Sequence, residues 1–132
     1  MNRTCVVLIA ILTTMFLAAL GAEAQTPTRV NFERGLDRTV LTGTLHGYGD
    51  RKSFVLRVRK GQKLTTQNAG KNYITVDIVP PKGSAYEPDL AADCHDHHDV
   101  HPTAAGDYVI RVVECRKADS WRGTFKLRVT VQ

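Results

Sequence analysis

Residues 94–101, which read Cys-His-Asp-His-His-Asp-Val-His, are the densest group of potential metal ligands in the chain. Side chains alternate between two faces of an extended strand. One face of such a strand would carry His95, His97, Asp99 and His101. Imidazoles and a carboxylate on one face can bind zinc or copper. Histidines two apart on a strand rarely complete a tetrahedral shell alone, so we expect an exposed polar segment, no stoichiometric metal and no cofactor.

The sequence lacks the common motifs of catalytic sites. It has no Gly-x-Ser-x-Gly, no His-Glu-x-x-His and no glycine-rich phosphate loop. Glu87 and Asp89 could be imagined as a glycosidase pair. They flank Pro88 in a turn-like stretch, however, where two acids are usually just solvated. The sequence therefore predicts a protein that is not an enzyme.

Arginines and tyrosines next to turns are the remaining polar candidates. Both side chains combine a large contact area with directed hydrogen bonds, which binding surfaces favour. The candidates are Tyr48, Arg51, Arg111, Arg116 and Arg122. Each also has a structural interpretation: Tyr48 could cover one end of the fold, and Arg111 could face water in mid-strand.

The first 24 residues have the three-part form of a secretory signal peptide. A basic start precedes an apolar run from Val6 to Leu20, and small residues occupy positions 22 and 24. An uncleaved anchor is the alternative, but the run is shorter than the ~20 residues of a membrane span and lacks a basic flank. We expect cleavage before Gln25. Residues 25–132 would then form one exported domain without a membrane span, periplasmic or alternatively secreted.

Net charge and cysteine content indicate which partners and which cross-links this exported domain could have. Loss of residues 1–24 removes one basic and one acidic residue, so the net charge stays at +5. The excess is spread along the chain without an aromatic-rich basic patch, and a nucleic-acid partner is not expected. Cys94 and Cys115 are an even pair in a small exported domain, which indicates a disulfide. A reduced pair or a pair of metal ligands is the alternative.

Short runs of alternating apolar and polar residues follow one another along the domain. Phe54, Leu56 and Val58 alternate with outward residues such as Arg57, and the same period of two recurs in residues 74–78, 108–112 and 125–131. Strict alternation over such short runs is typical of half-buried strands. Glycine- and proline-containing turns separate the runs. The pattern predicts an all-β domain, an antiparallel sandwich or barrel, with a free tail only at residues 25–29.

Four motifs give nearly the whole domain a resemblance to a known family. They are Val30-Asn31-Phe32-Glu33-Arg34-Gly35, Gly43-Thr44-Leu45-His46-Gly47-Tyr48, Lys60-Gly61-Gln62-Lys63, and Gly106-Asp107-Tyr108-Val109-Ile110-Arg111-Val112 with Arg116 just beyond. In this order and spacing the chain resembles the periplasmic inhibitors of g-type (goose-type) lysozyme. It is also similar to the broader bacterial pre-peptidase C-terminal domain. Both resemblances imply an antiparallel β-sandwich, here of about eight short strands.

The inhibitor family implies a g-type lysozyme as protein partner and a steric and electrostatic mechanism. Loops at one end of a rigid sandwich enter the lysozyme cleft, and Tyr and Arg side chains occupy sugar subsites near the acidic catalytic residue. The matching positions are Tyr48 and Arg116. Family members can carry a second arginine a few residues later. The segment is shorter here, and Arg122 or Lys117 is the candidate substitute.

Two other functions compete with inhibition. One is a non-catalytic ligand- or glycan-binding module of the pre-peptidase type. The other is a periplasmic metal-binding protein that uses the His-rich segment. The disulfide pair and that segment both depart from the inhibitor pattern. In addition, many lysozymes are basic, so a partner at +5 gains no long-range steering from net charge, and local complementarity must carry the contact.

Overall fold

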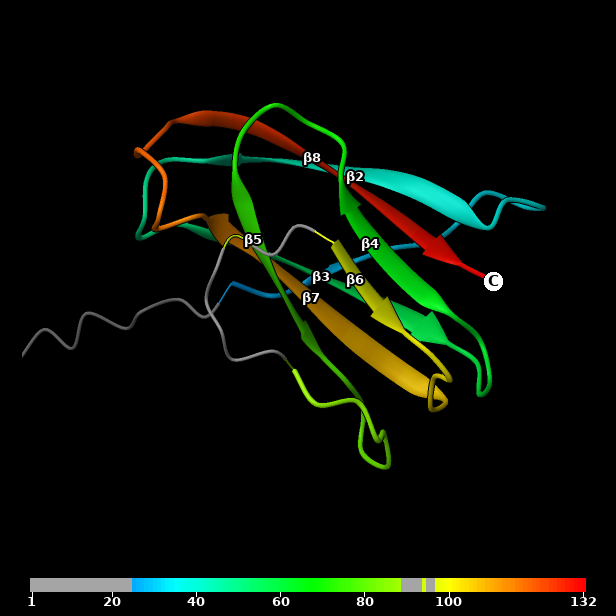
Figure 1. The fold of residues 1–132 in the computed structure, drawn as a ribbon. Helices are drawn as coiled ribbons and strands as arrows, with labels where there is room; N and C mark the ends of the chain where they lie inside the picture. Colours follow the sequence, from blue (N-terminus) through cyan, green and yellow to red (C-terminus); the bar gives the residue numbers. More distant parts are fainter. Residues whose placement is uncertain (1–24, 89–93, 95–96) are drawn as a thin grey trace, which may run out of the picture.

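Two four-stranded β-sheets face each other in the computed structural model of the chain (Figure 1). The structure describes residues 25–88, 94 and 97–132, so the predicted signal peptide, Asp89 and His95 lie outside the described residues. One sheet has the order β1-β3-β7-β5 and the other β2-β8-β4-β6. The strands are β1 Thr28–Arg29, β2 Arg38–Leu45, β3 Arg51–Val58, β4 Leu64–Asn68, β5 Ile74–Val79, β6 His97–Val100, β7 Gly106–Glu114 and β8 Gly123–Val131. The prediction of an all-β sandwich of about eight strands is confirmed.

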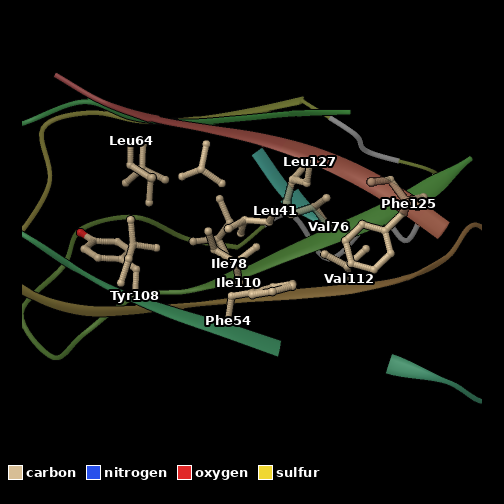
Figure 2. Close-up of a cluster of buried hydrophobic side chains, with 14 of the residues drawn as sticks. Leu41, Phe54, Leu64, Val76, Ile78, Tyr108, Ile110, Val112, Phe125 and Leu127 are labelled. Carbon is tan, nitrogen blue, oxygen red and sulfur yellow. The ribbon is translucent and has the colours of Figure 1, made fainter. Parts of the chain in front are cut away.

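Alternating side chains from both sheets meet in one core (Figure 2). Phe54 and Phe125 pack edge to face across it, with ring centroids 6.2 Å apart and ring planes at 80°, an arrangement that aromatic pairs prefer. A Cβ atom on Gly43 would come within 2.7 Å of the Phe125 ring, which explains glycine at that point of β2. Of the side chains predicted to point inward, Val131 is only partly buried against the core. The others are buried: Phe54, Leu56, Val58, Ile74, Val76, Ile78, Tyr108, Ile110, Val112, Phe125, Leu127 and Val129.

Two connections between the sheets lie at the same end of the sandwich. Leu45, the last residue of β2, pairs with Gly123, the first of β8. Arg51, the first residue of β3, pairs with Val113 near the end of β7. This register brings the β2–β3 loop (residues 46–50) close to the β7–β8 loop (residues 115–122), at the left of Figure 1. We call this the loop end of the sandwich.

The N-terminal residues differ from the predicted free tail. Thr28 and Arg29 form β1, which runs parallel to β3, whereas the other strand pairs of the described residues are antiparallel. The Arg29 guanidinium donates two hydrogen bonds to Asp107, at 2.9 and 3.0 Å. These bonds are the main reason that the pKa of Asp107 lies below its usual value. A strand of two exposed residues has no alternating pattern, so the sequence could not reveal it.

Part of the His-rich segment forms a strand that the alternation of apolar and polar residues did not predict. His97–Val100 forms β6 at the edge of the second sheet and pairs with β4, with Gln67 opposite His97. Its side chains are polar except for Val100, which is buried in the core. One apolar residue is too weak a signal for strand prediction. In the described part of the chain, no helix has the length and apolar character of a membrane span.

Candidate partner-binding site at the loop end

Tyr48 joins the two loops at the loop end. Its hydroxyl donates a hydrogen bond to the carbonyl oxygen of Ala118, from the middle of the β2–β3 loop to the middle of the β7–β8 loop. The side chain is still 37% exposed, so part of its ring faces solvent. The two interpretations of Tyr48 therefore combine: it braces the end of the fold and also contributes to its surface.

The β2–β3 loop is a turn fixed by Asp50. The Asp50 carboxylate accepts a hydrogen bond from the backbone N–H of His46 at 3.1 Å and contacts the His46 ring Nδ1 at 2.8 Å. The His46 contact is the largest cause of the lowered pKa of Asp50. Asp50 also donates its backbone N–H to the carbonyl of Gly47, whose φ of 117° suits glycine. The turn thus holds Tyr48 in a defined position.

The β7–β8 loop is tied to the sandwich by hydrogen bonds to the Glu114 side chain and to the Tyr73 carbonyl. Glu114, at the end of β7, is 1% exposed, and its Oε1 accepts the backbone N–H of Trp121 at 2.7 Å. The Tyr73 carbonyl accepts the Trp121 indole N–H at 3.0 Å and the Cys115 backbone N–H at 3.1 Å. Because Glu114 is buried, breaking its bond to Trp121 would leave a desolvated carboxylate oxygen unpaired, and this restricts the loop.

A disulfide holds the start of the β7–β8 loop. Cys94 and Cys115 are bonded, with their Cα atoms 4.8 Å apart, which confirms the predicted pair. Cys115 is fully buried, whereas the next residue, Arg116, is exposed. The cross-link therefore fixes the backbone immediately before the Arg116 guanidinium.

Tyr48 and Arg116 line the same surface groove. Its volume is about 450 Å³, and its lining residues are Gln25, Tyr48, Gly49, Asp50, Arg51, Val113 and Arg116. Two arginines, a tyrosine and an aspartate thus line one concave surface. Arginine and tyrosine side chains can recognise a carboxylate or carbonyl by charge-assisted hydrogen bonds and a sugar or side chain by ring contact.

Arg122 and two aromatic residues lie outside this groove. Arg122 is exposed at the end of the β7–β8 loop and does not line the groove. A second groove of about 480 Å³, along the same loop, is lined by Lys71, Asn72, Tyr73, Lys117, Ala118, Asp119, Ser120 and Trp121. Tyr73 is 65% exposed there, an unusual exposure for a large apolar ring. Sequence reasoning missed Tyr73 and Trp121, although both stand next to turns, the same signal that singled out Tyr48.

Residues His97–Val100 of the His-rich segment form the edge strand β6, and Asp99 is the centre of its side-chain contacts. Asp99 accepts a hydrogen bond from the Thr65 hydroxyl at 2.7 Å, the largest cause of its lowered pKa. It also pairs with Lys63 at 3.2 Å and His97 at 3.7 Å. The His101 ring lies 3.3 Å from the Gln62 carbonyl. No three potential metal ligands come together among the described residues, which do not include His95.

Comparison with known proteins relates this architecture to a defined group. Neither a protein-family model nor the sequence of a characterised protein matches the chain. Its structure is similar to that of Aeromonas hydrophila PliG, a periplasmic inhibitor of g-type lysozyme, with a TM-score of 0.65 and 23% identity over 81% of this chain and 96% of that one. The chain has the PliG fold. Salmonella Typhimurium PliG gives a TM-score of 0.57 at 19% identity, over 82% and 99% of the two chains.

The pre-peptidase fold is also similar, at a lower score. The pre-peptidase C-terminal domain of a Bacillus anthracis collagenase has a TM-score of 0.50 and 18% identity, over 82% of this chain and 96% of that one. The PliG fold therefore matches better than the pre-peptidase fold, and both agree with the resemblance seen in the sequence motifs.

Proposed function

We propose that this protein is an exported inhibitor of g-type lysozyme that blocks the lysozyme active-site cleft with its loop end. The observation that carries the proposal is the shared groove of Tyr48 and Arg116. The inhibitor motifs had singled out these two residues although they lie far apart in the sequence. The fold adds support, because PliG from two bacteria is described as a periplasmic inhibitor of g-type lysozyme.

In this proposal the protein inhibits lysozyme by occupying its cleft, and none of its side chains takes part in a chemical reaction. Arg116 presents its guanidinium to a carboxylate or carbonyl in the cleft, and the exposed part of Tyr48 lies where a sugar would bind. Arg51 adds a second positive charge, so the groove carries two arginines against one acidic residue, Asp50. Arg122 makes a peripheral contact from the β7–β8 loop. Local charge thus supplies the complementarity that the net charge of +5 does not. We accordingly propose that the protein is not an enzyme.

The rigidity of the loop end favours this mechanism. Ordering a mobile loop in a cleft subtracts from affinity, so an inhibitor gains from loops that are already fixed. The disulfide at Cys115, the Tyr48 contact with Ala118 and the buried Glu114 hold the two loops before any partner arrives. The disulfide also suits the oxidising periplasm, to which residues 1–24 would direct the chain as a cleaved signal peptide.

Titration of the purified exported protein against a g-type lysozyme tests the proposal. We expect loss of lysozyme activity at micromolar concentrations of the protein, which corresponds to a Kd of about 1 μM or tighter for the complex. Chicken-type lysozyme serves as the control and should stay more active. If g-type lysozyme remains fully active at micromolar excess, the inhibitor function is wrong and a binding module of the pre-peptidase type takes its place.

A further inference from the structure

The direction of β1 brings the N-terminal residues to the loop end. β1 is parallel to β3, with Thr28 opposite Phe54. Counting back three residues along both segments sets Gln25 beside Arg51, the first residue of β3. Gln25 does line the groove that contains Arg51, Tyr48 and Arg116. Gln25 is therefore part of the proposed binding surface.

Contacts within and after β1 hold this segment in place. The bidentate pair between Arg29 and Asp107 fixes orientation as well as distance. One residue later, the Val30 backbone N–H donates to the Val55 carbonyl at 2.8 Å, and Val30 and Phe32 pack against the core. Residues 25–27 directly precede β1, so the fixed position of β1 also restricts where Gln25 can lie.

We infer that Gln25 belongs to the lysozyme-binding surface and that inhibition requires removal of whatever precedes it. This inference rests on the proposed function. Any group bonded to the Gln25 nitrogen begins at the groove, where it would collide with a protein seated on Tyr48 and Arg116. Hydrolysis of the Ala24–Gln25 peptide bond by an export peptidase consumes one water and leaves a carboxylate on Ala24 and an amine on Gln25. The same cleavage that completes export therefore frees the binding surface.

The C-terminus lies at the opposite end of the sandwich and supplies a matched control. Gln132 exchanges two backbone hydrogen bonds with Lys63, at 2.7 and 3.0 Å, and its side-chain amide donates to Asp37 at 2.9 Å. These contacts hold the C-terminus at the right of Figure 1, away from the two loops. A group added after Gln132 would leave the loop end open.

The test compares one small folded domain fused directly ahead of Gln25 with the same domain fused after Gln132. A protease site at the N-terminal junction should allow release of a chain that begins with Gln25. We expect the N-terminal fusion to raise the half-maximal inhibitory concentration for g-type lysozyme by about tenfold or more, the equivalent of about 1.4 kcal/mol. The C-terminal fusion should inhibit like the unfused protein, and proteolytic release should restore full inhibition.

The two possible failures can be told apart. If the unfused protein inhibits and the N-terminal fusion inhibits equally well, Gln25 lies outside the contact surface and the inference is overturned. If the unfused protein leaves g-type lysozyme active, the proposed function fails and this inference falls with it. Equal melting temperatures of both fusions confirm that an effect comes from the position of the added domain.

Discussion

Replacement of Arg116 by alanine should weaken inhibition of g-type lysozyme about thirtyfold, because truncation of a desolvated anchor costs about 2 kcal/mol and each 1.4 kcal/mol is tenfold. Arg116 is exposed and directly follows the buried, disulfide-bonded Cys115, so its guanidinium is available and its backbone is fixed. The same exposure means that the fold does not depend on it. The melting temperature of Arg116→Ala should therefore stay within a few degrees of the wild-type value, as surface substitutions usually do.

Arg57→Ala is the matched control for this substitution. Arg57 is also an exposed arginine, but it stands opposite Asp107 in the β3–β7 pairing, at the end of these strands away from the loop end. Its removal changes the net charge by the same amount and should leave inhibition unchanged. If Arg116→Ala inhibits as well as the Arg57→Ala control, Arg116 is not a contact residue and the loops must bind through other side chains.

Replacement of Cys115 by serine should lower stability by about 3 kcal/mol, since a cross-link that closes a loop of about twenty residues restricts the unfolded chain by that amount. For a domain of this size the loss corresponds to a fall in melting temperature of roughly 10–20 °C. The variant should also inhibit less, because Arg116 loses the bond that fixes its neighbour. Thermal unfolding with and without reductant measures the effect.

Cys94→Ser provides an internal check on the disulfide. It breaks the same bond from the other side and should also lower the melting temperature, by no more than Cys115→Ser does, because Cys115 is fully buried and Cys94 is not. Reductant should lower the melting temperature of the wild-type protein and leave that of the variants unchanged. Alkylation of both cysteines in the native wild-type protein would contradict this account of the loop end.

The sequence predicted the parts of the fold that local patterns encode. Period-two alternation revealed the core of β3, β5, β7 and β8, because each of these strands buries one apolar face. It could not reveal β1, which consists of two exposed residues, or β6, whose only core residue is Val100. β1 forms only by pairing with β3, and β6 only by pairing with β4. The residues of β1 and β6 show no local sequence pattern that would predict this pairing.

The candidate site was predictable in part for the same reason. Tyr48 and Arg116 could be selected from motifs, and the antiparallel register then brought them to one groove. The bond from Tyr48 to the Ala118 carbonyl joins residues from two loops, and the sequence gives no sign of it. Hence Tyr48, selected from motifs as a contact residue, also supports the β7–β8 loop, and its replacement by alanine is expected to affect stability as well as inhibition.

Amide hydrogen exchange of the protein alone and in the presence of g-type lysozyme tests most directly whether the loop end is the inhibitory surface. The predicted result is slower exchange in the β2–β3 loop (residues 46–50) and the β7–β8 loop (residues 115–122) when lysozyme is present. The turn at Lys60 and Gly61, between β3 and β4, should exchange at the same rate in both samples. Slower exchange at that turn, with the two loops unchanged, would contradict the account.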